Sequence, residues 1–261
     1  MSPNLLQLTA YFTTLALFGV FGLLLNLVCV LCAWLPRTVR VERFFQRVIH
    51  HHFAIFLRWL RWLRICDVQF EGFEKIPART GLVIVANHPG LMDAVYVLAR
   101  VPEAFCIFKP AVRRNPVLGG SAVRAGYIGN TNPLELVRAA SAKLRAGQPL
   151  VIFPEGTRTP SGTTLLPLKP GFALIACKAG VPVQLVQITG DVHLLGKGRP
   201  WWQPARMPSH VRVVVGPQIA TAGKTPAQVV AETDAWLRAQ LVAPATSVRE
   251  PVIALAAPSS P

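Results

Sequence analysis

Residues 1–36 constrain this chain most, because they contain no Lys, Arg, Asp or Glu. From Leu15 to Leu35 the apolar run is interrupted only by Gly19, Gly22 and Asn26. A membrane-spanning helix needs about 20 predominantly apolar residues. We therefore predict a membrane anchor at 1–36, formed either by one tilted span or by a helical hairpin that dips into one leaflet.

The flanks of this run indicate its type and orientation. A secretory signal peptide is the alternative, but the usual basic start is missing, the run is too long, and no small-residue cleavage site precedes the arginines. Arginines follow the run at positions 37, 40, 43 and 47, and such an excess places that side in the cytoplasm. Because arginine far outnumbers lysine, as in GC-rich bacterial genomes, we expect a bacterial inner membrane with the rest of the chain on its cytoplasmic face.

Residues 37–66 carry a basic amphipathic pattern with two open interpretations. Apolar residues recur at helical spacing, with arginines on the opposite side: Phe45, Ile49, Phe53, Phe56, Leu60 and Leu63 against Arg43, Arg47, Arg58 and Arg61. With Trp59 and Trp62 at its flanks, the segment is typical of an interfacial helix lying on the membrane. A helix packed in a protein core, with a solvated arginine face, gives the same pattern.

Residues 67–242 alternate between short apolar runs and helical patterns. Strands are predicted at 82–86, 104–108, 149–153, 182–188 and 211–216, and helices at 91–100, 133–146, 169–179 and 225–242. This order predicts an α/β domain, with a mostly parallel or mixed sheet flanked by helices. The Ala-, Pro- and Ser-rich tail at 243–261 is expected to be disordered.

The net charge of +15 requires an anionic partner. No helix-turn-helix, zinc-finger or aromatic-basic RNA motif accompanies it, so membrane lipids are a better partner than nucleic acid. The five cysteines are scattered without metal-ligand spacing and are expected to be buried thiols in a reducing compartment. Neither a phosphate-binding loop nor a dinucleotide fingerprint is present, and we predict no metal and no cofactor.

Polar residues follow three of the predicted strands, where open α/β sheets bind their ligands. The first group is Asn87, His88 and Asp93, separated by a Pro-Gly turn. An aspartate in this position can fold back onto one imidazole nitrogen and leave the other to take a proton, which makes His88 a candidate general base. A helix-capping aspartate beside a surface histidine is the structural alternative.

The other two groups supply cations. The segment FPEGTR at 153–158 places Glu155 and Arg158 after a strand, and an arginine fork suits a phosphate. Lys109 and Arg113 follow another strand and are candidates to hold an anionic head group or the phosphates of a donor. Each segment alone is also compatible with an exposed loop.

Taken in order, His-x4-Asp, a basic segment ending in GYIGN, FPEGTR and VPVQLVQI resemble the 1-acylglycerol-3-phosphate acyltransferase family, over roughly residues 67 to 220. The resemblance implies acyl transfer from acyl-CoA or acyl-carrier protein to the free hydroxyl of a lyso-lipid, a step of phospholipid biosynthesis. It further implies that His88 is the base, that Asp93 orients it, and that the acceptor's glycerol phosphate region is bound by Glu155, Gly156, Thr157 and Arg158.

Two positions depart from the family pattern. The second motif usually ends in an arginine, which the segment 126–131 lacks, and Leu185 replaces the later proline of the fourth motif. The first departure favours an acceptor other than lysophosphatidate, such as a lyso-aminolipid. The motifs are also compatible with a lipid thioesterase or hydrolase that uses the same pair on water, and with a silent lipid-binding protein.

Overall fold

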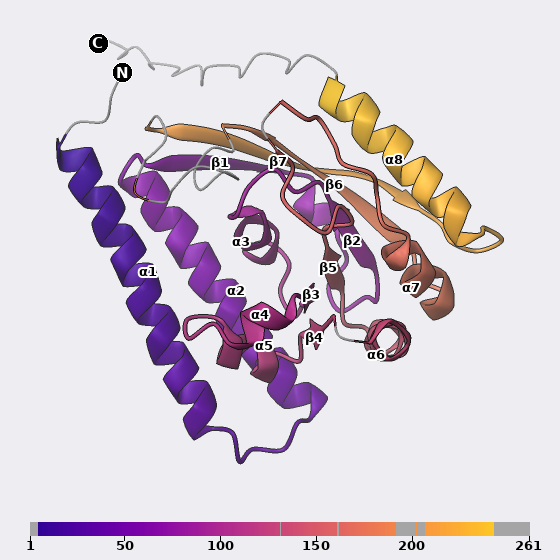
Figure 1. Cartoon of the computed structure of the whole chain (residues 1–261), viewed down its shortest axis with the longest axis horizontal. Helices are drawn as coiled ribbons and strands as arrows, with labels where there is room; N and C mark the ends of the chain where they lie inside the picture. The colour runs from indigo at the N-terminus through magenta and orange to yellow at the C-terminus, as the bar shows by residue number, and fades with distance from the viewer. Residues whose placement is uncertain (1–4, 131, 161, 192–201, 203–206, 243–261) are drawn as a thin grey trace, which may run out of the picture.

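The computed structural model describes residues 5–130, 132–160, 162–191, 202 and 207–242, and Figure 1 shows their arrangement. Within these residues, seven strands form one sheet in the order β1-β7-β6-β2-β5-β3-β4. The strands are β1 (Cys66–Glu71), β2 (Val83–Ala86), β3 (Phe105–Phe108), β4 (Ile128–Gly129), β5 (Leu150–Ile152), β6 (Val183–Gly190) and β7 (Ser209–Ile219). Only the β6–β7 pair is antiparallel, so the sheet is mixed, which confirms the predicted fold class.

Helices cover both faces of the sheet. They are α1 (Leu5–Leu31), α2 (Val39–Trp62), α3 (Asp93–Leu98), α4 (Pro110–Arg113), α5 (Gly119–Arg124), α6 (Pro133–Arg145), α7 (Gly171–Ala179) and α8 (Pro226–Val242), with a 3₁₀ turn, η1, at Phe73–Lys75. The alternating side chains of β2 explain the two layers. Ile84 and Ala86 pack with α2 and α3, whereas Val83 and Val85 pack with α6, α7 and α8. A strand buried on both faces therefore reads as a continuous apolar run.

The ends of the predicted helices follow their capping residues. The side chain of Asn132 accepts hydrogen bonds from the backbone N–H groups of Leu134 and Glu135, and Pro133 begins α6. Gly180, with φ +69°, ends α7 in the left-handed region. Besides η1, four elements were absent from the sequence prediction. These are β1, a partly exposed strand at the sheet edge, and the short β4, α4 and α5, which span too few residues for a periodic pattern.

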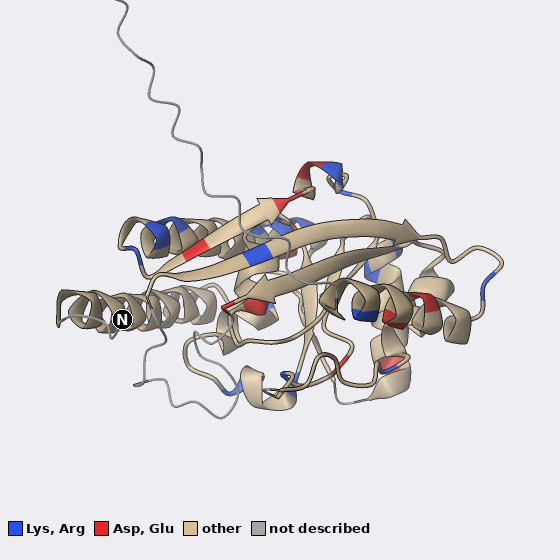
Figure 2. Cartoon of the chain, turned by 90° about the horizontal axis from the view of Figure 1, so that it is seen from above, with Lys and Arg blue, Asp and Glu red and all other residues tan. Residues whose placement is uncertain are grey.

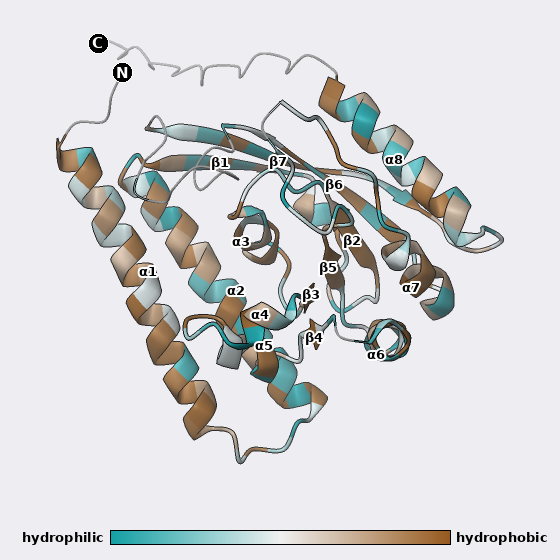
Figure 3. Ribbon diagram, in the orientation of Figure 1, coloured by the Kyte–Doolittle hydropathy of each residue, from teal (hydrophilic) through white to brown (hydrophobic). Residues whose placement is uncertain are grey.

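Helix α1 lies against α2 and α5, and does not stand apart from the domain (Figure 1). Phe18 packs on the rings of His52 and Phe56, and the Asn26 side chain accepts a hydrogen bond from the Gly120 N–H of α5 at 2.5 Å. By length and composition this helix could cross a membrane. Figure 3 shows it as mainly hydrophobic, and its outer face exposes Leu17, Val20, Leu24, Leu27 and Leu31.

Helix α2 buries its apolar face in the same core as the sheet. Phe45, Ile49, Phe53 and Leu60 are all buried there, so the face that could have rested on lipid is covered by protein. The predicted 37–66 segment therefore shares a core with the α/β domain. The predicted tail at 243–261 lies outside the described residues.

A buried carboxylate joins α2 to the domain. Glu103 lies 3.5–3.6 Å from nitrogens of Arg43 and Arg47 on α2 and of Arg79, and its side chain is only 8% exposed. These separations are ion pairs and not hydrogen bonds. Because the carboxylate is largely removed from water, solvent screens its three ion pairs only weakly. Its neutralisation would leave the three arginines without their common partner.

We predict that Glu103→Gln lowers the free energy of unfolding by about 1–3 kcal/mol. The matched control is Glu71→Gln, which breaks the ion pair of Glu71 with Arg212, whose two side chains are 45% and 48% exposed. Solvent screens that pair, so its loss is expected to cost no more than about 1 kcal/mol. Denaturant unfolding in one neutral detergent measures both. Equal losses would show that the Glu103 cluster adds nothing beyond a surface pair.

Candidate active site

The three predicted polar groups follow neighbouring strands of the sheet. β2, β5 and β3 lie side by side and run parallel, so their carboxyl ends meet at one edge. His88 follows β2, Glu155 and Arg158 follow β5, and Lys109 follows β3. The pairing order, which no local pattern reveals, therefore brings residues from distant parts of the sequence to one edge.

His88 and Asp93 are in direct contact. The distance between His88 Nδ1 and Asp93 Oδ2 is 2.8 Å, and the Gly90 N–H donates to the same carboxylate oxygen at 2.7 Å. An ionised carboxylate can only accept, so with Asp93 charged the Nδ1 atom carries the proton. The lone pair then belongs to Nε2. The imidazole is 20% exposed whereas the carboxylate is 0% exposed, so the histidine is the member of the pair that can reach a ligand.

The backbone of His88 is held on both sides by the segment that follows β5. Its N–H donates to Glu155 Oε1 at 2.7 Å, and its carbonyl accepts from the Thr159 N–H at 2.8 Å. The imidazole stacks on Phe153, with ring centroids 4.5 Å apart. Main chain, ring plane and Nδ1 are thus each restrained, which favours a single orientation of the base.

Glu155 organises this loop and does not face an open cleft. The residue is 3% exposed, and its second oxygen accepts from the Thr159 hydroxyl at 2.7 Å and the Leu166 N–H at 3.0 Å. Glu155 was predicted to touch the acceptor, and that contact stays a prediction. In the structure protein donors engage both of its carboxylate oxygens, which suits an anion that would otherwise repel a phosphate.

Asn87 joins the loop to the next strand. Its side-chain N–H donates to the Ile188 carbonyl at 2.9 Å, and its side-chain oxygen accepts from the Ile188 N–H at 2.8 Å. These two bonds continue the β2–β6 pairing beyond the end of β2. The backbone directly before His88 is therefore fixed to β6 by the Asn87 side chain.

The last three residues of the FPEGTR segment at 153–158 lie partly at the surface. Thr157 and Arg158 are half-buried, and Gly156 has φ +70°. Lys169 was missed by the sequence analysis. A Cβ at Gly156 would lie 2.7 Å from Lys169 Nζ, so the ammonium group lies over the glycine. The only local signal of Lys169 is a basic residue directly before the Pro-Gly that begins α7.

Lys109 and Arg113 are both exposed. Lys109 is the N-cap of α4, directly after β3, and Arg113 is the last residue of this one-turn helix. The sheet order places them on the same edge as His88, two strands away from β2. Within the described residues, no group of three or more His, Cys, Asp or Glu side chains is arranged to hold a metal ion.

The two departures from the family pattern have different structural settings. Leu185 lies inside β6, fully buried and opposite Val85 of β2, where a proline would remove a backbone donor from the sheet. In the second motif, Gly129 ends β4 and Asn130 is exposed, while Thr131 lies outside the described residues.

Residues 67–189 match a family model described as Acyltransferase. A 1-acyl-sn-glycerol-3-phosphate acyltransferase of Helicobacter pylori is 33% identical over 143 residues, covering 50% of this chain and 60% of the relative. The relative in Mus musculus described as the alpha form of the same enzyme is 28% identical over 236 residues, covering 86% and 77%. The chain spans 60% and 44% of the H. pylori and Cocos nucifera relatives, less than two thirds of their length.

A solved structure extends the similarity to nearly the whole chain. The crystal structure of the 1-acyl-sn-glycerophosphate acyltransferase PlsC from Thermotoga maritima superposes with a TM-score of 0.71 and 26% identity, covering 93% of this chain and 97% of that one. These matches confirm the resemblance inferred from the four motifs.

The burial of Asp93 leads to a prediction on stability. Burial raises the pKa of this carboxyl, while the contacts with His88 and the Gly90 N–H lower it by smaller amounts. A raised pKa means that folding favours the protonated form. The associated stability is therefore complete below the unfolded pKa of an aspartate and is lost as the pH rises through the folded value.

We expect Asp93→Asn to be at least as stable as the unmodified protein at neutral pH and to lose this advantage at acidic pH. The amide oxygen can still accept from Nδ1 and from Gly90, and the buried charge at position 93 is removed. Thermal unfolding in detergent between about pH 4 and pH 8 tests this. Asp234→Asn, in a partly exposed ion pair with Arg238, is the control. A variant that is less stable at neutral pH would mean that the carboxylate's bonds outweigh its desolvation.

Proposed function

We propose that this chain, whose residues 67–189 belong to the acyltransferase family, is a membrane-bound O-acyltransferase. It transfers a fatty acyl group from acyl-CoA or acyl-carrier protein to the free hydroxyl of a lysoglycerophospholipid such as 1-acylglycerol-3-phosphate. The observation that carries this proposal is the His88–Asp93 hydrogen bond in a loop held from both sides by the segment after β5. The names of the relatives support the acceptor class.

The arrangement suits proton transfer from an alcohol. Nε2 of His88 takes the proton of the acceptor hydroxyl while the oxygen attacks the thioester carbonyl carbon. The C–S bond then breaks, and the imidazolium returns its proton to the departing thiolate. Asp93 stabilises the transient imidazolium and keeps the proton on Nδ1 between turnovers. A thioester is already activated, so this sequence of steps uses no metal or nucleotide.

The cations at the same sheet edge are suited to the anionic parts of the substrates. Arg158 and Lys169 lie on the segment that holds His88, so they are placed to bind the acceptor's phosphate. Lys109 and Arg113, farther along the edge, suit the phosphates of a CoA or carrier-protein donor.

The membrane-bound mode is supported by α1. Its outer face exposes large apolar side chains, and Figure 2 shows no charged residue on it, whereas α2 beside it carries Lys/Arg bands. Both the acceptor and the product are lipids, so the active site must open near the bilayer surface. We propose a location at the cell inner membrane with residues 67–242 on the cytoplasmic face.

A second acceptor class has one observation in its favour. The second motif lacks the usual arginine around Gly129 and Asn130, which removes one cation from the acceptor side. A lyso-lipid with another head group, such as a lyso-aminolipid, is therefore the alternative acceptor. The test is a screen of purified protein with both donors against several lyso-lipids and without acceptor. Acylation of none, with or without thioester hydrolysis, would contradict the transferase proposal.

Removal of the base is expected to abolish most turnover. His88→Asn keeps a side-chain amide near Asp93 but cannot accept the hydroxyl proton, so kcat should fall by about 10²–10⁴-fold. His51→Asn, an exposed histidine on α2, is the matched control and should keep normal turnover. Product analysis by mass spectrometry measures both variants. Full acylation by His88→Asn would exclude His88 as the base.

Glu155 and Arg158 should differ in which kinetic constant they change. Glu155→Gln replaces an acceptor of three protein hydrogen bonds by an amide that also donates, which displaces the His88 loop and lowers kcat with little change in acceptor KM. Arg158→Ala should raise the acceptor KM. Steady-state kinetics with varied acceptor distinguish them. An increased KM for Glu155→Gln with unchanged kcat would return Glu155 to the ligand-binding residues.

A further inference from the structure

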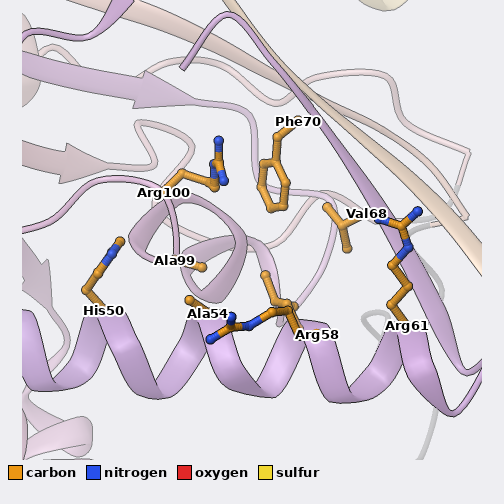
Figure 4. Close-up of a pocket in the computed structure, with 9 residues that line it drawn as sticks. His50, Ala54, Arg58, Arg61, Val68, Phe70, Ala99 and Arg100 are labelled. Carbon is orange, nitrogen blue, oxygen red and sulfur yellow. The ribbon is translucent and has the colours of Figure 1, made fainter. Parts of the chain in front are cut away.

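An open cavity of ≈ 400 Å³ lies between α2, β1 and the residues that follow α3 (Figure 4). Its apolar wall consists of Ala54, Leu57, Val68, Phe70 and Ala99, and its polar lining consists of His50, Arg58, Arg61 and Arg100. The polar lining contains three arginines and no carboxylate. Such a cavity combines attraction for an anion with a surface for an apolar chain.

Two of the arginines are held by neighbouring side chains. The guanidinium of Arg100 lies over the ring of Phe70 at 5.1 Å and over that of Phe73 at 5.9 Å. Arg61 lies 3.2 Å from Asp67, which offsets part of its charge, and its side chain remains 73% exposed. Arg58 is also exposed and lies on α2, three residues before Arg61. In Figure 4, Arg58 and Arg61 project from α2 on the side where Phe70 and Arg100 lie.

The cavity adjoins the apolar surface proposed to contact lipid. On α2, the exposed residues Phe44, Ile55, Trp59 and Trp62 recur at helical spacing beside α1. The next stripe around the same helix is basic and leads to the cavity: Arg40, Arg47, His51 and Arg58. Tryptophan beside arginine is typical of the level of lipid head groups, which is consistent with a cavity that faces lipid phosphates.

The cavity is separate from the candidate active site. Asp93 begins α3, whereas the cavity is lined by residues after its last turn, and His50 Nδ1 donates to the Leu98 carbonyl at 2.9 Å there. The residues that line it include none of His88, Glu155 and Arg158.

We propose that this cavity is a non-catalytic site for the phosphate head group of an anionic phospholipid of the bilayer. Arg58 and Arg100 hold the phosphate, and the start of an acyl chain lies along Phe70, Val68 and Leu57. The bound lipid holds the carboxyl-terminal half of α2 at the membrane surface. Diffuse attraction to the bilayer, or binding of soluble phosphate, are the competing explanations of the same charges.

The test is native mass spectrometry of the full chain in neutral detergent, titrated with phosphatidylglycerol or phosphatidylcholine. The proposal expects a saturable phosphatidylglycerol adduct that Arg58→Gln/Arg100→Gln weakens by about 10- to 30-fold. The matched control Arg40→Gln/Arg138→Gln removes two exposed arginines outside the cavity and should weaken the adduct no more than about twofold. Arg58→Gln against Arg40→Gln repeats the comparison if the double variant does not fold.

Three results would overturn the proposal. Equal losses in the two double variants would mean diffuse attraction, and equal binding of the two lipids would exclude a site selective for an anionic phospholipid. Displacement of the lipid by equimolar inorganic phosphate would identify a soluble-phosphate site instead. Turnover on short-chain soluble substrates should be unchanged in Arg58→Gln/Arg100→Gln, so failure of the lipid site and failure of the proposed acyl transfer are observed separately.

Discussion

The buried carboxylate of Glu155 is the interaction on which the site depends. It accepts hydrogen bonds from the His88 N–H, the Thr159 hydroxyl and the Leu166 N–H, and so joins the loop after β2 to the long segment after β5. Hydrogen bonds to both oxygens offset the desolvation free energy of a buried carboxylate. Removal of any one donor would leave part of that desolvation free energy uncompensated. The orientation of the imidazole follows from this bridge, because the same loops also hold the His88 carbonyl and ring.

Two kinds of charged residue surround His88. Asp93 and Glu155 are buried anions that position the histidine, while Arg158, Lys169 and Lys109 are more exposed cations along the same sheet edge. This separation keeps negative charge behind the imidazole and positive charge on the side where the proposed phosphorylated substrates would approach. Electrostatic preorganisation of this kind requires no rearrangement at the moment of reaction.

The amino-terminal helices join the proposed membrane-contacting surface to the rest of the domain. One face of α2 packs in the domain core, and a second, beside α1, exposes Trp59 and Trp62. Arginines form a third, basic stripe along the same helix. The ion pairs of Glu103 and the contact of Asn26 with Gly120 fix both helices to the domain. The proposed lipid site and the proposed active site are therefore attached to opposite ends of α3, and both are held at defined positions relative to α1.

The sequence by itself determined the longer elements with a clear hydrophobic pattern and the polar residues that follow the strands. The apolar run of β2, the caps of α6 and the His88–Asp93 spacing all depend on neighbours within a few residues, so local patterns predict them. Only the tertiary structure decided that Glu155 binds the His88 loop, that Lys169 covers Gly156, and that the apolar face of α2 packs in the core. Each of these depends on which strands pair and which helix faces cover them. Because residues 67 positions apart meet in the His88–Glu155 contact, no local pattern could reveal it.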